Sequence, residues 1–187
     1  NYLISAFDGL GFLYGQITYY LGFVPHKHEG KVTGLAAFGN PKKTINIFKK
    51  IVSCKSGEIK CNLNEYRPFY TKLSKKLLTK LRKHSKEDIA AGVQKHCEDI
   101  VYKWIKYWIK KNKNKNVKNI CLAGGVFGNV KINQIVSEIK GVKNVYVFPH
   151  MADGGIPFGS AALAKYNLSK KGKIVFDNMY SGPIFKD

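Results

Sequence analysis

Residues 117–165 contain two consecutive strand–turn–helix units. The first, over 117–139, reads VKNICLA-GGVFGN-VKINQIVSEI, and the second, over 144–165, reads NVYVF-PHMADGGIP-FGSAALAK. Short β-branched runs that end in glycines and open a helix are typical of a parallel α/β sheet. Ligands of such sheets bind beyond the carboxyl ends of the strands. This stretch therefore predicts an α/β fold in which a first glycine turn (124–129) and a second glycine turn (149–155) face a ligand.

The two glycine turns have the composition of an anion site. Gly124 and Gly125 allow the backbone to approach a ligand closely, and the helix that follows offers unpaired N–H groups at the positive end of its dipole. Asn129 is placed to hydrogen-bond a base, a ribose or an acyl oxygen, and Asp153 to bind a metal or orient a charge. The alternative is structural, with plain turns and with Asn129 and Asp153 as caps or turn formers. Both interpretations stay open, because short glycine motifs are weak evidence.

A third corner lies near the amino terminus. The apolar run over 2–7 reads as a strand, and Asp8 and Gly9 follow it directly. This pair is either another ligand-facing corner or a common turn dipeptide. A helix is predicted immediately afterwards, over 12–23.

A fourth candidate segment begins a short helix. Glu29, Gly30 and Lys31 place an acid and a base on either side of a glycine, where they could bind a polar substrate. His26 and His28 alternate just before them, but an isolated His-x-His is far more often a solvated turn than a metal site.

The middle of the chain is predicted to be mainly helical. We expect a short helix over 45–52, a hairpin near Ser56 and Gly57, a surface helix over 73–83, and the longest helix over 87–111. The longest helix carries an apolar stripe that predicts core packing: Ile89, Val93, Cys97, Ile100, Val101, Trp104 and Trp108.

Length and composition predict one globular domain. A chain of 187 residues with 44% hydrophobic residues can bury one sizeable core. It has no apolar run long enough to span a bilayer, and we expect no signal peptide. It begins without Met and ends abruptly, so we expect a piece of a longer protein.

The net charge is +20, from 32 Lys and Arg against 12 Asp and Glu. Such a balance ordinarily favours nucleic acid or an anionic surface as a partner. Here only Arg67 and Arg82 are arginines, and the lysines are spread over helices instead of framing stacked aromatics. Nucleic-acid binding is therefore possible but not favoured.

The four cysteines form no Cys-x-x-Cys pair, which argues against a structural zinc site. Cys121 lies in a strand that is predicted to be buried and Cys97 on the apolar face of a predicted helix, so both are expected to be small core residues. We infer a reducing, cytoplasmic setting.

Five segments, in order along the chain, carry a resemblance to a known family. They are LGFLY with LGF (10–14, 21–23), EGKVTGLAAFG (29–39), DIAAGVQ (88–94), LAGGVFGNV (122–130) and DGGIPFGSAA (153–162). Together they resemble the O-carbamoyltransferases of the NodU/CmcH type. The resemblance implies an α/β fold of the actin/Hsp70/sugar-kinase superfamily, with a mostly parallel sheet flanked by helices. It also implies kinship with the threonylcarbamoyl-adenosine transferases of tRNA modification.

The resemblance implies an activity and its cofactors. A carbamoyl group would pass from carbamoyl phosphate, with ATP and through a carbamoyl-adenylate, to a hydroxyl of a sugar or natural product. Asp153 resembles the family's aspartate ligand of an iron-like divalent metal. Gly124, Gly125 and Asn129 resemble its adenylate-binding turn.

The two upstream segments are carried over in the same way. Glu29, Gly30 and Lys31 resemble the segment that closes over the nucleotide or the acceptor. Asp8 and Gly9 resemble the phosphate-facing corner of the superfamily.

The sequence also departs from the family pattern. No two histidines lie four residues apart, as the family's other metal ligands do, and the hairpin expected after Asp8 is missing. We therefore expect residues 1–166 to be the second half of a carbamoyltransferase amino-terminal domain, inactive alone, and 167–187 to be a linker toward a missing carboxyl-terminal domain. The alternatives are a tRNA threonylcarbamoyl-adenosine-type transferase, a basic nucleic-acid-binding module without catalysis, and a remnant that only packs against a partner.

Overall fold

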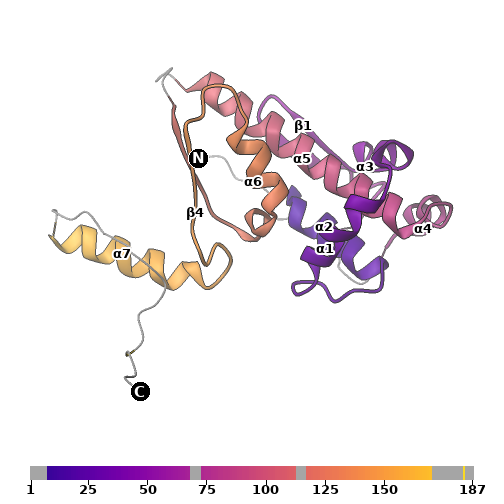
Figure 1. The fold of residues 1–187 in the computed structure, drawn as a ribbon, viewed down its shortest axis with the longest axis horizontal. Coiled ribbons are helices and arrows are strands. Elements are labelled where there is room, and N and C mark those ends of the chain that lie inside the picture. Colours follow the sequence, from indigo (N-terminus) through magenta and orange to yellow (C-terminus); the bar gives the residue numbers. More distant parts are fainter. Residues whose placement is uncertain (1–7, 68–72, 113–116, 170–182, 184–187) are drawn as a thin grey trace.

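A computed structural model describes residues 8–67, 73–112, 117–169 and 183 (Figure 1). Its elements alternate helices with two short strand pairs. In chain order they are α1 (Leu10–Tyr20), α2 (Glu29–Leu35), η2 (Ala36–Phe38), η3 (Pro41–Lys43), α3 (Ile45–Lys49), β1 (Val52–Lys55), β2 (Glu58–Cys61), α4 (Lys75–Leu81), α5 (Lys86–Lys111), β3 (Asn119–Leu122), η4 (Gly125–Gly128), α6 (Val130–Ser137), β4 (Asn144–Val147) and α7 (Gly155–Ser169).

The long helix α5 is the axis of the core, as the apolar stripe predicts (Figure 1). The Ser85 side chain caps it by accepting a hydrogen bond from the backbone N–H of Asp88, and acids and lysines occupy its first and last turns as the helix dipole favours. Around α5 pack side chains that are fully buried, among them Leu13 and Ile17 of α1, Val32 of α2 and Phe48 of α3.

The amino-terminal half of α5 makes very close backbone contacts. A β-carbon on Gly92 would lie 1.9 Å from the Oγ1 atom of Thr44, whose hydroxyl donates to the carbonyl oxygen of Asp88 at 2.6 Å. The buried Asp88 carboxylate accepts from the backbone N–H of Asn40 at 2.8 Å and pairs with Lys43 at 2.7 Å. The Lys43 ammonium and the Asn40 N–H lower the pKa of Asp88. This corner of the core leaves no room for a larger residue at position 92.

The β1–β2 hairpin forms at the predicted place and lies along α5, with contacts from His96 to Trp108. Ser56 and Gly57 both have positive φ angles, as a tight two-residue hairpin turn requires. The indole Nε1 of Trp108 donates to the carbonyl oxygen of Gly57 at 3.0 Å. Trp108 is 42% exposed, so its predicted place in the core is wrong: it holds the hairpin turn at the rim of the core. The predicted helix over 45–52 is also shorter, because Val52 begins β1.

Strands β3 and β4 are parallel neighbours in register Asn119↔Asn144 to Leu122↔Val147. One face of the pair packs inward, with Leu122 buried and Val145 and Val147 half-buried. The other face carries Cys121 and Tyr146, which are exposed. The expectation that Cys121 is a core residue is therefore wrong, because this strand is covered on one face only; Cys97 is buried as expected.

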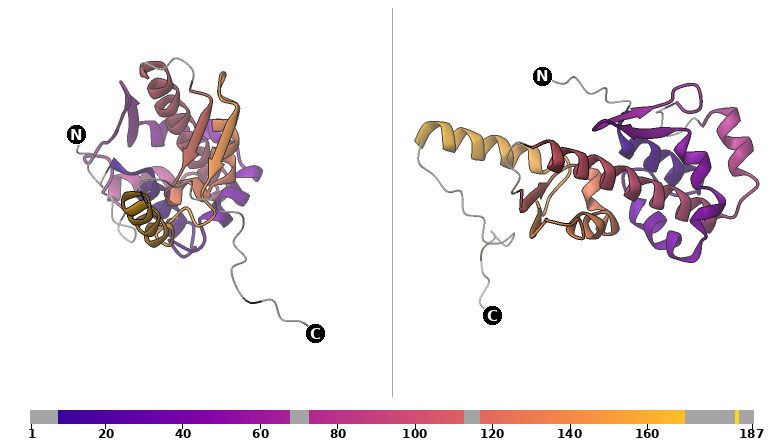
Figure 2. Two further views of the ribbon diagram at one scale, coloured as in Figure 1. Left: turned by 90° about the vertical axis from the view of Figure 1, so that its left-hand side faces the viewer. Right: turned by 90° about the horizontal axis from the view of Figure 1, so that it is seen from above.

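Helix α7 projects away from the other elements in Figure 1 and in the right-hand view of Figure 2. None of its residues is buried, although it carries five exposed large apolar side chains: Ile156, Phe158, Leu163, Tyr166 and Leu168. A helix that is apolar around its circumference is ordinarily covered by other protein. The described residues cover little of α7: the ring of Phe148 packs against Phe158, with 5.0 Å between ring centres, and the other four side chains stay largely exposed.

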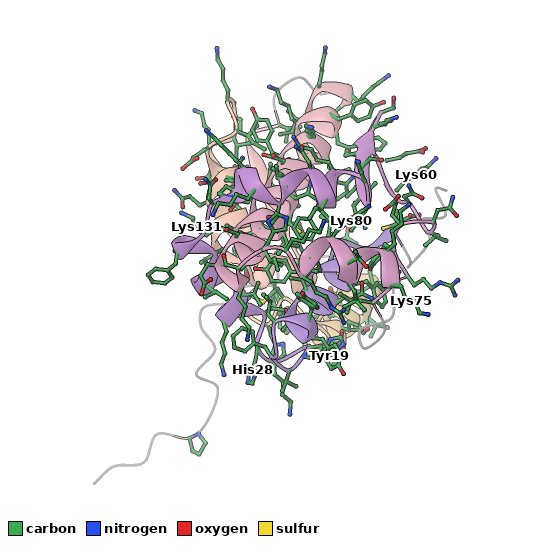
Figure 3. All side chains as sticks on the ribbon, turned by 90° about the vertical axis from the view of Figure 1, so that its right-hand side faces the viewer. Tyr19, His28, Lys60, Lys75, Lys80 and Lys131 are labelled. Atoms are coloured by element: carbon green, nitrogen blue, oxygen red, sulfur yellow. The ribbon has the colours of Figure 1, made fainter. Side chains whose placement is uncertain are left out.

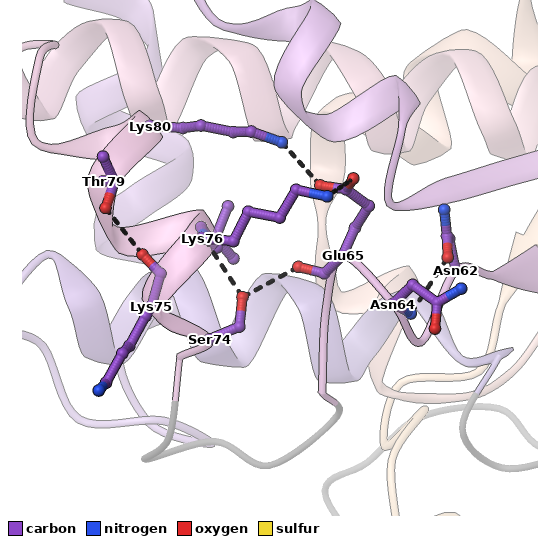
Figure 4. Close-up of polar contacts among 9 residues, drawn as sticks. Asn62, Asn64, Glu65, Ser74, Lys75, Lys76, Thr79 and Lys80 are labelled. Atoms are coloured by element: carbon purple, nitrogen blue, oxygen red, sulfur yellow. Dashed lines mark hydrogen bonds and ion pairs between the residues drawn. The ribbon is translucent and has the colours of Figure 1, made fainter.

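A small ion-paired cluster holds α4 against the chain that follows the hairpin (Figure 4). The Glu65 carboxylate pairs with Lys76 and, at 2.6 Å, with Lys80. The Ser74 hydroxyl donates to the carbonyl oxygen of Glu65 at 3.0 Å and caps α4 by accepting from Leu77 N–H. The two lysines hold the pKa of Glu65 down, at about 2.

The described residues thus form a mixed α/β structure, which agrees with the predicted class. They contain one parallel and one antiparallel strand pair, and the relation to the actin/Hsp70/sugar-kinase superfamily stays a prediction. The predicted strand over 2–7 lies outside the described residues. The proposed division at 166 also stays a prediction, with α7 running to Ser169.

Candidate functional site

The two glycine turns lie side by side, as the parallel strands require. The backbone N–H of Gly124 donates to the carbonyl oxygen of Met151 at 2.6 Å, which joins the first glycine turn to the second. Gly124 has φ +109° and ψ 149°, a backbone conformation that residues other than glycine rarely adopt. Gly124 and Gly125 are both exposed, so the backbone of the first turn is open to solvent.

The start of α1 lies against the first glycine turn. A β-carbon on Gly11 would lie 3.7 Å from Cγ2 of Val126 in η4. Gly9 is the N-cap residue and supplies no side-chain cap to the helix. The Asp8 carboxylate accepts from the backbone N–H of Cys61 at 2.6 Å, so it binds the end of β2. The Asp8 and Gly9 corner is therefore close to the turn through Gly11, while the Asp8 side chain has a structural partner.

Asn129 caps helix α6. Its Oδ1 atom accepts from the backbone N–H groups of Lys131 at 3.2 Å and Ile132 at 3.3 Å. The capping alternative considered from the sequence is thus present. These two N–H groups of α6 are therefore already engaged by the chain itself.

The Asn129 side chain also enters a hydrogen-bond cluster, the Gln94 network, made of the buried Tyr14, Gln94 and Glu98 and the half-buried Thr33 and Asn129. Asn129 Nδ2 donates to Gln94 Oε1 at 2.8 Å and to Thr33 Oγ1 at 3.2 Å. Tyr14 donates its hydroxyl hydrogen to Gln94 Oε1 at 2.7 Å and lies 2.8 Å from Thr33 Oγ1. Burial of the hydroxyl raises the pKa of Tyr14 well above its ordinary value.

Sequence reasoning did not single out the other members of the Gln94 network. Gln94 and Glu98 lie four residues apart on α5, within the buried stretch that includes Val93 and Cys97. Polar side chains at such positions must find hydrogen-bond partners inside the protein. The two polar residues in this buried stretch of helix indicate a hydrogen-bond site, but they could not identify Tyr14 and Asn129 as the partners.

The Glu29–Lys31 segment begins α2, and its side chains contact the loop before it. Glu29 Oε1 accepts from the backbone N–H of His26 at 2.6 Å, and Lys31 Nζ lies 5.8 Å from the centre of the Phe23 ring. Gly30 is exposed, and a β-carbon there would meet no atom within 4 Å. The contact of α2 with the first glycine turn is instead made by Thr33, through Asn129.

Asp153 is exposed on the second glycine turn. Beside it, the ring of His150 fills the space that a side chain at position 154 would need, since a β-carbon there would lie 2.2 Å from the ring. Within the described ranges, no group of three or more His, Cys, Asp or Glu side chains is placed to hold a metal ion. These residues do not by themselves fit the iron-like ion that the resemblance implies, because such sites ordinarily use three or more protein ligands.

Lysines project from many separate elements. In Figure 3, Lys131 of α6 and Lys75 of α4 lie on opposite sides of the molecule, with Lys60 of β2 on the same side as Lys75. The high positive charge is thus distributed over the surface, as the sequence indicated.

Comparison with known proteins identifies the family. The sequence model described as "Carbamoyltransferase N-terminus" matches residues 1–162. The chain belongs to this family. This match confirms the resemblance that the five short segments indicated. The family is named for carbamoyl transfer.

Relatives of this family member come from archaea and bacteria. It is 30% identical to an uncharacterised protein of Methanocaldococcus jannaschii over 165 residues, which cover 86% of this chain and 26% of that protein. It is 26% identical to the nodulation protein NolNO of Sinorhizobium fredii over 185 residues, 94% of this chain and 26% of that protein. The nodulation protein NolO of Bradyrhizobium diazoefficiens is 26% identical over 167 residues, 87% and 29% of the two chains.

The chain spans about a quarter to a third of the length of the curated relatives that it matches. In the part of the chain that the structure describes, no helix has the length and apolarity needed to cross a bilayer.

Proposed function

We propose that this chain is the nucleotide-facing part of an O-carbamoyltransferase. The whole enzyme would transfer a carbamoyl group from carbamoyl phosphate, with ATP and through a carbamoyl-adenylate, to a hydroxyl of a sugar or other small molecule. Family membership supports carbamoyl transfer in general. The acceptor, the adenylate intermediate and the cytoplasmic setting are part of the proposal.

One observation carries the assignment of the site: three of the segments selected from the sequence meet at the first glycine turn. The second glycine turn reaches it through Met151, α1 through Gly11, and α2 through Thr33. These segments lie far apart in sequence, and their convergence leaves the exposed backbone of Gly124 and Gly125 at the centre. An exposed, glycine-built backbone is suited to close approach by a phosphate or an adenylate.

In this proposal the backbone of the first glycine turn binds the ligand, and the Asn129 side chain supports the turn. Asn129 Oδ1 and Nδ2 already have partners within the protein, so its role in the proposal is to hold the turn. Ligand contact is assigned to the backbone of Gly124 and Gly125. Asp153 remains the proposed metal ligand, and its ion would need further ligands from residues other than those described.

The rest of the longer polypeptide is the proposed partner of this chain. The exposed apolar side chains of α7 and the exposed Cys121 face of the β3–β4 pair are surfaces that such a partner would cover. The relatives' greater length supports this proposal.

The test is a calorimetric titration of the folded chain with AMP and with ATP, with and without Mn²⁺ or Fe²⁺. Saturable binding is expected, and Gly124→Ala should weaken it at least about tenfold, because alanine resists the φ angle of +109°. Gly159→Ala in α7 is the matched control, since a β-carbon there meets no atom within 4 Å. Absence of binding by the folded chain would contradict a self-sufficient nucleotide site.

The net charge of +20 favours a second candidate function, binding to nucleic acid. This candidate includes both the tRNA threonylcarbamoyl-adenosine-type transferase and a basic module without catalysis. RNA binding that weakens steeply as salt rises, and that Gly124→Ala leaves unchanged, would support the module over the carbamoyltransferase site.

A remnant that only packs against a partner is the remaining alternative. Under it, Asn129→Ala and Asp153→Ala would change stability alone and would leave ligand binding and transfer by the complete protein unaltered.

A further inference from the structure

The strongest unassigned feature is the side chain of Gln94, which is 5% exposed and lies at the meeting point of α1, α2, α5 and α6. Its Oε1 atom accepts from the Tyr14 hydroxyl at 2.7 Å and from Asn129 Nδ2 at 2.8 Å. Its Nε2 atom donates to Glu98 Oε1 at 2.9 Å and to Asn129 Oδ1 at 3.2 Å. The amide therefore uses two acceptor and two donor positions, which is the full capacity of a glutamine side chain.

This arrangement fixes which way the amide points. A flipped Gln94 would direct its oxygen at the Glu98 carboxylate and its N–H₂ group at the nitrogen of Asn129. Both contacts would be repulsive, since each would pair acceptor with acceptor or donor with donor. Glu98 thus selects the orientation of Gln94, and Gln94 in turn selects that of Asn129.

The orientation of Asn129 determines the local backbone. With Oδ1 turned toward the start of α6, it caps Lys131 and Ile132, and its Nδ2 reaches Thr33 of α2. The same residue ends the first glycine turn. The half-buried amide of Asn129 therefore links the conformation of this turn to the position of α2.

We infer that Gln94 is a positioning residue that acts through Asn129 to hold the first glycine turn in its ligand-binding conformation and to couple that turn to α2. The inference rests on the proposed function for the identity of the ligand. Gln94 is buried beneath the turn, so its effect on a nucleotide is exerted through Asn129.

The test uses a pair of substitutions that separates positioning from folding. Gln94→Glu places a second carboxylate beside Glu98 and removes the donor to Asn129, so both stability and ligand binding should fall. Adding Glu98→Gln restores a donor facing residue 94 and relieves the repulsion, but it does not replace the bond to Asn129 Oδ1. Lys95→Gln, at an exposed position one residue along α5, is the control.

Three quantities are measured for each variant: the urea midpoint, the Kd for AMP, and the rate of hydrogen exchange at the amides of Lys131 and Ile132. In the double variant we expect the midpoint to recover, the two amides to exchange at least about tenfold faster than in the unsubstituted chain, and AMP to bind about tenfold more weakly. Recovery of both AMP affinity and amide protection along with stability would overturn the inference.

The hydrogen-exchange readout needs no ligand, so it separates this inference from the proposed function. If the unsubstituted chain binds no AMP, the nucleotide site fails on its own. Faster exchange in the stable double variant would still support positioning by Gln94, and unchanged exchange would overturn it.

Discussion

The region around α5 and the region around β3, β4 and α7 use similar apolar residues in opposite ways. Around α5, the side chains of Leu13, Ile17, Val32 and Val93 have no exposed surface. In α7, Leu163 is 60% exposed and Leu168 is 88% exposed. The difference is in the number of neighbouring elements: α5 is surrounded by helices and a hairpin, whereas the described residues cover the β3–β4 pair on one face and leave most of α7 exposed.

This contrast teaches that an apolar pattern specifies a face to be covered but not what covers it. In the region around α5, the helices and the hairpin cover one another's apolar faces, so its glycines and polar groups are in close contact with neighbouring residues. The open region carries the second glycine turn and Asp153, and its surfaces are free to meet other protein. Four predictions test the contrast, from the largest expected effect to the smallest.

Thiol reactivity should separate the two regions most strongly. Cys121 is exposed and should react with iodoacetamide as an unfolded thiol does, whereas Cys97 is buried and burial raises its pKa to about 12. We expect Cys121 to react roughly 10³-fold faster or more, because Cys97 reacts only when the core opens. Peptide mass spectrometry over time, repeated in urea as a control, measures both rates. Similar rates in the absence of urea would show that the two regions are equally covered or equally open.

Matched glycine substitutions should differ next most. Gly92→Ala should destabilise the chain by roughly 3 kcal/mol, since the added methyl group meets Thr44 and Phe48 in a corner that cannot expand without breaking the bond from Thr44 to Asp88. Gly159→Ala should be neutral or slightly stabilising, because alanine favours an exposed helix. Urea unfolding curves give both values, and an equal loss in the two variants would contradict the contrast.

Acid should weaken the packed region through His96. This residue is 2% exposed, donates from Nε2 to the carbonyl oxygen of Val52 at 3.0 Å, and has its pKa lowered by burial to about 4 from an ordinary 6.5. The folded state therefore binds fewer protons than the unfolded state between these values, so this stabilisation is complete above pH 6.5 and is lost as pH falls toward 4.

The expected loss from His96 between pH 7 and pH 5 is roughly 2 kcal/mol. His96→Gln keeps an N–H donor near Val52 and removes the titration, so its unfolding free energy should fall less over the same range. Urea curves at several pH values check this, with the carboxylates acting as a common background in both proteins. Identical pH profiles would mean that His96 is not the group responsible.

The ion-paired cluster at α4 should matter least. Glu65→Gln removes the charge that pairs with Lys76 and Lys80 but keeps a side chain of similar shape. A small loss of stability at low salt is expected, shrinking at high salt because the exposed Lys76 partner leaves the pair open to screening by ions. Urea midpoints at two salt concentrations test this, with Glu58→Gln, whose partner is Lys60 on the same strand, as control. A large loss that ignores salt would mean that Glu65 supports the packing of α4 by another route.

The sequence predicted local structure well where the signals were local. The two glycine turns and the hairpin at Ser56 and Gly57 all lie where short-range patterns placed them. The errors came where a residue's environment depends on distant segments. Trp108 follows the apolar stripe of α5 but ends at the rim beside the hairpin, and Cys121 follows a strand pattern but lies on an uncovered face.

The candidate site shows the same division. The sequence marked Gly124, Gly125 and Asn129, and the structure groups them with parts of α1, α2 and the second glycine turn. It could not indicate that Asn129 is held by Gln94, because the two residues are 35 positions apart. Hydrogen-bond partners across helices depend on how the helices cross, which no short pattern records.

By itself, the sequence determined the family, the strand–turn–helix units and the positions where only glycine suits the backbone, since these follow from local conformation and from motif order. Tertiary structure alone decided which of the marked segments meet, which apolar faces stay open, and which polar side chains are buried together. The physical reason is that burial and hydrogen bonding are properties of contacts between distant segments, and those contacts exist only once the chain is packed.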